Sequence, residues 1–389
     1  AKLTAKGDVK ISINNGDRII TTEPGSSLLS TLAGQKIFLP SACGGKGSCG
    51  MCKCQVDSGA GSILPTETGF FSYKQQHENW RLACQVKVKE NIEMRIPESV
   101  MGIKKWECTV VSNRNISTFL KEFVVKLPEG ENLKFKSGGY IQIDVPALDV
   151  DFKDMIIDEK YKGDWEKMKM FDLKMHNPEP TYRAYSMANS PAEGNIIMLN
   201  IRIATPPFDR AAGAFAPVNP GICSSFIFSR KPGDKVTISG PYGEFFLRET
   251  NNEMMFIGGG AGMAPMRSHI FNLFHTIHTD RKVTFWYGAR ALQEAPYVDE
   301  FNKIQEENPN FHWTLALDRP DPVADAAGVA YKPGFVHQVI FENYLKNHEN
   351  PEDIEYYLCG PPMMIQAVTK MLYDLGVPDE NVMYDNFGG

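Results

Sequence analysis

The chain has 389 residues, of which 42% are hydrophobic and 23% charged, and its formal net charge is −6. This composition is typical of a globular protein with room for about two or three domains, and the negative charge argues against nucleic acid as a partner. No segment approaches the run of about 18 apolar residues that a membrane-spanning helix needs, and no signal peptide is recognisable.

The first part of the chain, residues 1–100, is predicted to form a small mixed β-sheet of β-grasp-like type. Residues 9–13, 84–88 and 92–96 alternate apolar and polar side chains, which is the pattern of half-buried strands. Residues 26–34 predict a short helix between the first strands and the motif that follows.

The most specific motif in the chain is the C-x5-C-x2-C run formed by Cys43, Cys49 and Cys52. It is close to the plant-type [2Fe–2S] spacing, widened by one residue in its first gap, and its glycines would let backbone N–H groups point at the sulfurs. Zinc and disulfides are the alternatives, but structural zinc sites usually pair their ligands, and disulfides suit short secreted chains. The sequence therefore predicts a [2Fe–2S] cluster held by Cys43, Cys49, Cys52 and Cys84.

The second part, residues 101–250, is rich in short strands. Residues 107–112, 118–127, 140–145 and 196–203 are β-branched or aromatic runs, bounded by glycine, proline and asparagine. Several such strands without long helices between them predict an antiparallel β-barrel.

Residues 148–180 interrupt the barrel pattern and are predicted to be a surface insertion. The segment is charged and aromatic, with little periodicity, and long insertions are often functional. Aromatic anchors among charges are typical of a docking interface, and the alternative is a flap that merely shields the barrel. The candidate anchors are Phe152, Tyr161, Trp165 and Phe171.

The third part, residues 251–389, is predicted to be a parallel α/β sheet. Short apolar strands at 282–287, 311–317 and 355–359 are separated by helical stretches. A glycine-rich run between a strand and a helix is the setting that a dinucleotide site requires. The glycines of that run are Gly258, Gly259, Gly260 and Gly262.

Three shorter motifs carry polar groups suited to a ring and its phosphates. Arg183-Ala184-Tyr185-Ser186 offers a fork for phosphate, a flat stacking face and a hydroxyl, although an ordinary surface strand could also have this sequence. Gly221-Ile222-Cys223-Ser224-Ser225 could form an anion site at a helix start, from N–H groups and two serine hydroxyls, or an ordinary N-cap at either serine. Cys359 ends the last long strand, where ligands of open α/β sheets bind, or it is simply a buried cysteine.

The order of the motifs R-A-Y-S, G-I-C-S, G-P-Y-G-E-F-F, G-G-G-A-G-M-A-P and C-G-P-P resembles the ferredoxin–NADP reductase superfamily over residues 103–389, behind a plant-type ferredoxin domain. Longer stretches, among them G-G-Y-I-Q-I, R-A-Y-S-M-A-N, L-N-I-R-I-A-T-P-P and the terminal D-N-F-G-G, are similar to the F-subunit family of Na+-translocating NADH:quinone oxidoreductases. The run from Pro206 to Pro220 follows that family least well.

The resemblance implies a multi-domain α+β and α/β protein with three cofactor domains. Residues 1–100 would be the [2Fe–2S] ferredoxin-type domain, residues 101–250 the FAD-binding β-barrel and residues 251–389 the NADH-binding α/β domain. It further implies that Arg183 pairs with the FAD pyrophosphate and that Tyr185 stacks on the flavin ring.

The resemblance also assigns the remaining site residues. Ser186 would hydrogen-bond flavin N5, Cys359 would lie beside the nicotinamide, and Phe387 would cover the other flavin face. The pyrophosphates would be held by two glycine-containing loops: FAD by Gly221, Cys223 and Ser224, and NADH by Gly258, Gly259, Gly260 and Gly262.

The implied function is electron input: hydride passes from NADH to FAD, and single electrons then pass through the cluster to the other membrane subunits of the sodium-pumping quinone reductase. In this family an N-terminal transmembrane helix precedes the ferredoxin domain, so the sequence is expected to be the remaining part of an inner-membrane protein on the cytoplasmic face. The alternatives are a soluble NADH-dependent reductase component of a bacterial oxygenase and a non-enzymatic metal-binding module. Arg290 could meet a 2′-phosphate and Glu294 a ribose hydroxyl, and the resemblance favours NADH over NADPH.

Overall fold

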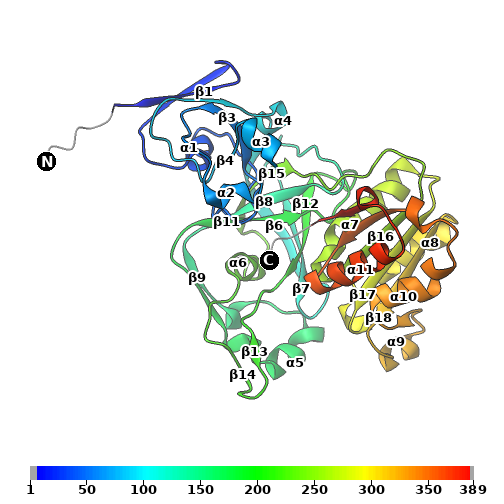
Figure 1. Ribbon diagram of the computed structural model, residues 1–389. Helices are drawn as coiled ribbons and strands as arrows, with labels where there is room; N and C mark the ends of the chain where they lie inside the picture. The colour runs from blue at the N-terminus through cyan, green and yellow to red at the C-terminus, as the bar shows by residue number, and fades with distance from the viewer. Residues whose placement is uncertain (1–6, 386–389) are drawn as a thin grey trace.

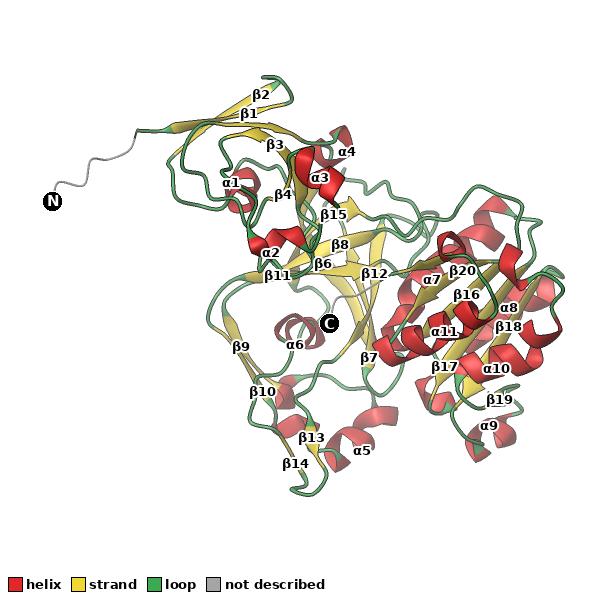
Figure 2. Ribbon diagram, in the orientation of Figure 1, coloured by secondary structure: helices red, strands yellow, loops and turns green. Residues whose placement is uncertain are grey.

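The structure is a computed structural model that describes residues 7–385. Three units follow one another along the chain, and Figure 1 shows the N-terminal unit above a central β-sheet domain, with a layered α/β domain to one side. Figure 2 shows that helices are concentrated in the α/β domain, whereas the other two units consist mostly of strands and loops. The predicted multi-domain architecture is confirmed.

The N-terminal unit is a five-stranded mixed sheet in the order β2-β1-β5-β3-β4. Only the β1–β5 pair is parallel. The strands are β1 (Val9–Ile13), β2 (Arg18–Thr22), β3 (Lys53–Ser58), β4 (Trp80–Leu82) and β5 (Ile92–Arg95), and the helices are α1 (Leu28–Gly34), α2 (Pro65–Thr68), α3 (Tyr73–His77) and α4 (Glu98–Met101). Leu28, Leu29 and Leu32 of α1 are buried against this sheet, which confirms the predicted helix and the mixed sheet.

The strand predicted at 84–88 is wrong. Val86 and Val88 are fully buried, which explains the alternating pattern, but the segment forms an isolated antiparallel bridge between Lys87 and Ser27 in place of a strand. The carbonyl of Val86 accepts instead from the N–H of Leu28, the first residue of α1, at 2.8 Å, and the carbonyl of Ala83 accepts from Leu29 at 3.0 Å. The segment satisfies the free N–H groups of a helix start rather than a strand edge.

The central domain is a six-stranded antiparallel sheet in the order β11-β8-β15-β6-β7-β12. Its strands are β6 (Lys104–Asn115), β7 (Leu120–Lys126), β8 (Tyr140–Val145), β11 (Thr181–Ser186), β12 (Ile196–Arg202) and β15 (Lys235–Tyr242), and helix α6 (Ile222–Phe228) packs on it. An isolated bridge between Met187 and Leu199 joins the two ends of the sheet order. This curled sheet confirms the predicted antiparallel barrel.

The insertion folds as β9 (Leu148–Asp151), α5 (Glu159–Lys167) and β10 (Lys174–Asn177), with β9 and β10 paired antiparallel. Phe152 and Trp165 are fully buried, and Tyr161 is 6% exposed. The Trp165 ring stacks on Phe228 of α6 at 6.0 Å between centroids, and its indole N–H donates to the carbonyl of Thr118 at 2.7 Å. These aromatic side chains belong to the core beneath α6, so the prediction that they anchor a partner is wrong; Phe171 also packs on Trp165.

Trp165→Ala is therefore expected to lower the stability of the central domain by about 3–5 kcal/mol, because it opens a cavity and leaves the Thr118 carbonyl without its indole donor. Chemical denaturation followed by circular dichroism measures the effect. Glu166→Ala, at the exposed neighbouring position of α5, serves as the control. An unchanged midpoint for Trp165→Ala would contradict the core assignment.

The C-terminal domain is a six-stranded sheet in the order β19-β18-β17-β16-β20-β21, with every pair parallel. Its strands are β16 (Met254–Gly259), β17 (Val283–Ala289), β18 (Phe311–Leu317), β19 (Lys332–Pro333), β20 (Glu355–Cys359) and β21 (Val382–Tyr384). The helices are α7 (Met263–Phe271), α8 (Val298–Glu307), α9 (Pro322–Ala327), α10 (Val336–Asn343) and α11 (Pro362–Asp374). Separate hydrophobic clusters form in this domain around Phe285 and around Tyr356, which confirms the predicted parallel α/β sheet.

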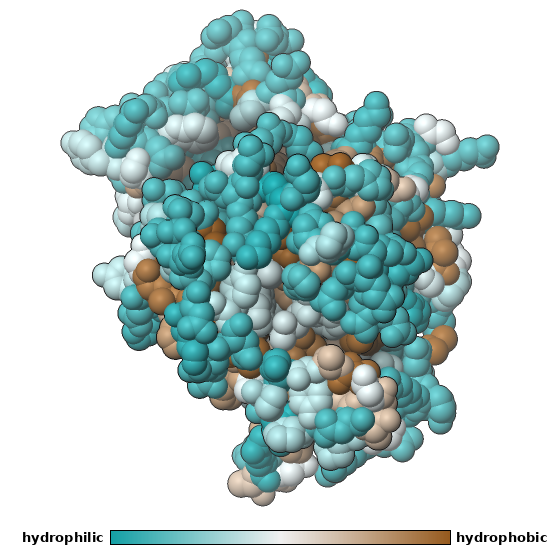
Figure 3. Space-filling view, turned by 90° about the vertical axis from the view of Figure 1, so that its right-hand side faces the viewer, coloured by the Kyte–Doolittle hydropathy of each residue, from teal (hydrophilic) through white to brown (hydrophobic). Residues whose placement is uncertain are grey.

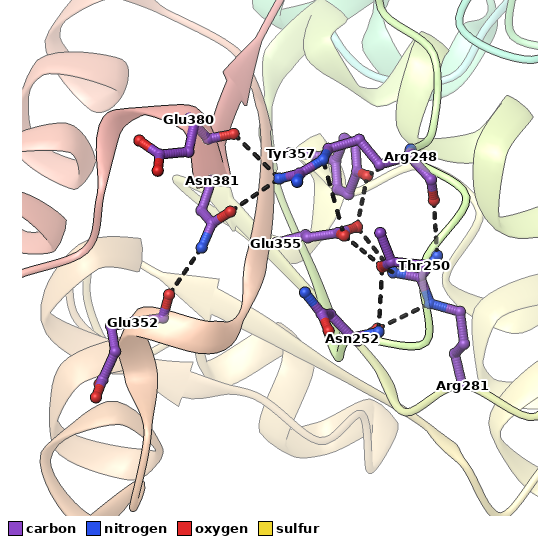
Figure 4. Close-up of polar contacts among 9 residues, drawn as sticks. All are labelled: Arg248, Thr250, Asn252, Arg281, Glu352, Glu355, Tyr357, Glu380 and Asn381. Atoms are coloured by element: carbon purple, nitrogen blue, oxygen red, sulfur yellow. Dashed lines mark hydrogen bonds and ion pairs between the residues drawn. The ribbon is translucent and has the colours of Figure 1, made fainter.

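The linker between the central and C-terminal domains is fixed by a buried carboxylate (Figure 4). Glu355, at the start of β20, is fully buried and accepts from the Arg281 guanidinium at 2.8 Å and from the Thr250 hydroxyl. Arg281 also donates to the carbonyl of Arg248 at 3.0 Å, and Arg248 donates to Oδ1 of Asn381 at 2.8 Å. The linker is thus bonded both to β20 and to the turn that precedes β21.

The side of the molecule formed by the C-terminal domain is mostly hydrophilic, with hydrophobic side chains in scattered groups (Figure 3). Among residues 7–385, no helix combines the length and the apolar character needed to cross a membrane.

Candidate active site

The four cysteines of the predicted cluster lie together in the loop before β3 and the turn after β4, and all are free thiols. Cys43 and Cys49 lie close enough for each to influence the pKa of the other, and the same holds for Cys52 and Cys84. Within residues 7–385, no three or more His, Cys, Asp or Glu side chains converge on one metal-ion position. Two thiol pairs fit a two-iron cluster, in which each iron takes two cysteines, better than a single-ion site.

The surroundings of each pair favour one thiolate. Burial raises the pKa of Cys43, but the N–H groups of Ser48 and Cys49 outweigh it and lower the pKa to about 6. The Cys52 sulfur lowers the pKa of Cys84 to about 7 against the effect of burial. The other thiol of each pair has a raised pKa: burial is the main cause for Cys49, and the Cys84 sulfur is the main cause for Cys52. A bound iron would deprotonate the remaining thiols, so this donor set fits the cluster.

Two loop glycines show why the loop needs residues without side chains. Gly47 and Gly50 have φ of +79° and +67°, in the left-handed region that favours glycine. A methyl group on Gly50 would lie 2.2 Å from the Phe70 ring, and one on Gly47 would lie 2.5 Å from the Gln85 amide. That amide lies 3.6 Å from the Cys84 sulfur, as a donor to it. The loop is therefore wrapped as tightly around the sulfurs as the sequence predicts.

The end of β11 meets the end of β20. Ser186 of β11 is buried, and its hydroxyl donates to Oδ2 of Asp385 at 2.7 Å. The N–H of Asp385 donates to the carbonyl of Leu358, so the carboxylate reaches Ser186 from the edge of β20. Cys359, fully buried at the end of β20, has a raised pKa because of burial and the nearby Asp385. The structure thus brings together the predicted Ser186 and Cys359.

Asp385 is the site residue that sequence reasoning missed. Burial raises its pKa, and the Ser186 hydroxyl partly opposes this. The only signal was its place in the D-N-F-G-G terminus, because a single carboxylate has neither period nor spacing. Phe387, predicted to cover the flavin, lies outside the described residues, which end at Asp385.

Arg183 and Tyr185 lie on β11 beside the other predicted flavin residues. Tyr185 packs against the barrel core, and burial and the neighbouring Cys223 raise its pKa. The Arg183 guanidinium donates to the carbonyl of Tyr182 at 2.7 Å and to the Thr181 hydroxyl at 3.1 Å. Burial raises the pKa of Cys223 to about 11, although the positive charge of Arg183 acts in the opposite direction. Arg183 therefore stands close to the loop that precedes α6.

The Gly221–Ser224 segment lies at the start of α6, and the Ser224 side chain hydrogen-bonds within it and to the neighbouring Ala204. The Ser224 hydroxyl accepts from the N–H of Ala204 at 3.1 Å and donates to the carbonyl of Gly221 at 3.2 Å. A methyl group on Gly221 would lie 2.6 Å from Cβ of Ala204. The next hydroxyl, of Ser225, is buried without a hydrogen-bond partner in the part of the chain that the structure describes. An unpaired buried donor in the same helix turn as Cys223, whose pKa the charge of Arg183 influences, fits a site for the FAD pyrophosphate.

The glycine-rich run begins with the last two residues of β16 and leads into α7, between a strand and a helix as predicted. Gly262 is needed for packing, since a methyl group there would lie 2.0 Å from the carbonyl of Cys359. Gly258 and Gly259 are also hemmed in, by Met266 and by Met364. Gly260, with φ of +53°, has no atom within 4 Å on its Cβ side, which leaves room for a phosphate to approach. The run lies beside Cys359, at the carboxyl end of the sheet.

Three family models match the chain, one in each structural domain. They are the 2Fe-2S iron-sulfur cluster binding domain over residues 11–89, the oxidoreductase FAD-binding domain over residues 167–247 and the oxidoreductase NAD-binding domain over residues 256–370.

Two curated relatives, each named as the F subunit of a Na(+)-translocating NADH-quinone reductase, match along the whole chain. The protein from Methylococcus capsulatus is 54% identical over 389 residues, covering 100% of this chain and 94% of the relative. The protein from Pseudomonas aeruginosa is 52% identical, covering 100% and 93%. Among solved structures, a ferredoxin reductase in carbazole 1,9a-dioxygenase is similar with a TM-score of 0.61 and 25% identity, covering 98% of each chain.

Proposed function

The chain belongs to the F-subunit family of Na(+)-translocating NADH-quinone reductases, and on this premise we propose that it is the NADH-oxidising electron-input component of such a complex. It carries domains for a [2Fe–2S] cluster, FAD and NAD. Hydride from NADH goes to FAD, and single electrons leave through the cluster. FAD supplies the step from two electrons to one, which neither NADH nor the cluster can perform.

The observation that best supports this assignment is the position of β11 between the other two sites. At its end, Ser186 donates to Asp385 of the nucleotide-binding domain, and Asp385 lies close enough to Cys359 to raise its pKa. At its start, Thr181 and Arg183 lie against the cluster loop. One strand of six residues therefore reaches both the place where a nicotinamide would lie and the place where electrons would leave.

For the individual residues we propose the roles that the family resemblance implies. Arg183 and the Gly221–Ser224 segment hold the FAD pyrophosphate, with the free Ser225 hydroxyl as an added donor. Tyr185 would stack on the flavin ring, and Ser186 would turn its single hydroxyl hydrogen from Asp385 to flavin N5. Cys359 and the loop at Gly260 receive NADH.

The partners in this proposal are the other subunits of the sodium-pumping quinone reductase. The relatives' name describes one component of a Na+-translocating quinone reductase. We infer that this chain works at the cytoplasmic face of a bacterial inner membrane and that sodium movement belongs to the other subunits.

A visible spectrum taken during anaerobic addition of NADH tests the proposal. Flavin bands are expected to bleach first and cluster bands second, with the signal of a reduced [2Fe–2S] centre appearing by electron paramagnetic resonance. NADPH should act far more slowly. A protein that binds neither cofactor, or whose flavin NADH does not bleach, would contradict electron input.

The alternative, a soluble reductase component of an oxygenase, predicts the same spectrum. Adding the protein to quinone reductase membranes depleted of their own NADH-oxidising component separates the two. Restored NADH:quinone activity is expected; no restoration by a protein with both cofactors would favour the oxygenase component.

A further inference from the structure

The cluster loop rests directly on β11, although the two belong to different domains. A methyl group on Gly44 would lie 3.1 Å from the Arg183 guanidinium and 3.2 Å from both the Thr181 hydroxyl and the Tyr182 carbonyl. Figure 1 shows β11 where the N-terminal and central domains meet. Gly44 has a φ of +67°, which favours glycine, and a side chain there would be crowded by the strand.

Tyr182 is the β11 side chain that enters the cluster loop. A methyl group on Gly45 would lie 3.9 Å from the Tyr182 hydroxyl, and this hydroxyl faces that of Ser41. The Tyr182 phenol therefore lies against the loop that carries three of the four predicted ligands, Cys43, Cys49 and Cys52.

Ser41 links this phenol to a ligand sulfur. Its hydroxyl oxygen accepts from the N–H of Gly45 at 3.0 Å and lies 3.9 Å from the Cys43 sulfur. A serine hydroxyl has two acceptor positions and one hydrogen. When Gly45 and the Tyr182 hydroxyl fill the acceptor positions, the hydrogen is left for Cys43. A hydrogen bond to a ligand sulfur stabilises the more negative, reduced cluster and raises its potential.

We propose that Tyr182 is a positioning residue through which the flavin-binding strand seats the cluster loop and orients the Ser41 hydroxyl toward Cys43. This inference rests on the electron-input function proposed above and assigns to Tyr182 the contact between the flavin and cluster sites. Tyr182 is not oxidised or reduced in this role. It fixes the position of the cluster loop relative to the flavin strand, and it fixes the hydrogen bond from Ser41 to Cys43 that tunes the potential of the cluster.

Tyr182→Phe tests the proposal because it removes the hydroxyl and keeps the ring. Cofactor content and flavin reduction by NADH are expected to stay unchanged. Cluster reduction after the flavin should slow about tenfold, the effect of one lost hydrogen bond. The cluster's midpoint potential, measured by a dithionite titration that needs no NADH, should shift to more negative values.

Tyr242→Phe is the matched control. The Tyr242 hydroxyl donates to that of Ser239 at 3.1 Å, which is the same pair of side chains within one domain instead of across two. Neither the potential nor the rate of cluster reduction should change. Ser41→Ala breaks the proposed contact from the loop side and should shift the potential in the same direction as Tyr182→Phe.

A wild-type potential and cluster-reduction rate in Tyr182→Phe would overturn the proposal, and so would an equal shift in Tyr242→Phe. Should Tyr182→Phe fail to fold, the potential of Ser41→Ala decides: an unchanged value refutes the contact. If NADH fails to reduce the flavin of the wild-type protein, the proposed function is wrong. Normal flavin reduction together with an unchanged cluster potential in Tyr182→Phe refutes only the role of Tyr182.

Discussion

Cys49→Ser is expected to abolish the [2Fe–2S] cluster while FAD stays bound and NADH still reduces it. Cys49 supplies one of the two sulfurs in its pair, and Cys43 alone cannot complete the coordination of one iron. The N-terminal domain and the flavin-binding barrel have separate hydrophobic cores, so losing the cluster should not unfold the flavin site. Iron and sulfide analysis measures the loss, and a dye that accepts electrons from flavin measures the remaining activity.

Electron delivery to a one-electron partner served by the cluster should disappear in the same variant. Cys54→Ser is the matched control, since Cys54 is fully buried in β3 with its sulfur 3.9 Å from the carbonyl of Arg81, and it should keep the cluster. A flavin-replete Cys49→Ser protein that has lost dye reduction as well would contradict the linear order NADH, FAD, cluster.

Ser186→Ala is expected to slow flavin reduction by NADH about tenfold or more, without loss of FAD. The substitution removes the one hydroxyl hydrogen that Asp385 accepts in this structure and that flavin N5 would accept when FAD is bound. A lost hydrogen bond of about 1–3 kcal/mol corresponds to a rate change of this size or greater. Stopped-flow absorbance at the flavin band measures the rate.

The pH dependence of that rate separates a role at the site from mere packing. The Ser186 hydroxyl lowers the pKa of Asp385, which burial raises, so removing the hydroxyl should raise this pKa further. Any inflection due to Asp385 should then move to higher pH in the variant. Ser137→Ala removes an equally buried serine that donates to the carbonyl of Ser268, and it should leave both rate and inflection unchanged. A normal rate in Ser186→Ala would show that Ser186 only packs.

The parts of the site that sequence could predict are those written in consecutive residues. The Cys43–Cys52 motif, the R-A-Y-S strand and the glycine run before α7 each carry their spacing within one loop or one strand–helix junction. Asp385 could not be found this way, because it lies 199 residues from Ser186 and only the fold brings the two together.

The docking role predicted for the insertion rests on its charged and aromatic composition and overlooks the spacing of its aromatic residues. Helix α5 is charged overall, yet Tyr161 and Trp165 lie four residues apart and so share one face, which is the mark of a helix packed on a core. The strand predicted at 84–88 is wrong for a different reason, because here the spacing of apolar residues is misleading. Its alternation reflected true burial of Val86 and Val88, but backbone bonding to α1 decided the local structure.

The Glu355 network also bears on the geometry of the hydride transfer proposed for this chain. Arg248 belongs to the linker between the flavin and nucleotide domains, and it holds the turn from which β21 carries Asp385 to Ser186. The relative placement of the two domains and the position of the Asp385 carboxylate therefore depend on the same few side chains. A change in this linker would therefore move the nucleotide domain and the Asp385 carboxylate together. Its effect on the proposed turnover would exceed the sum of separate losses in flavin binding and nucleotide binding.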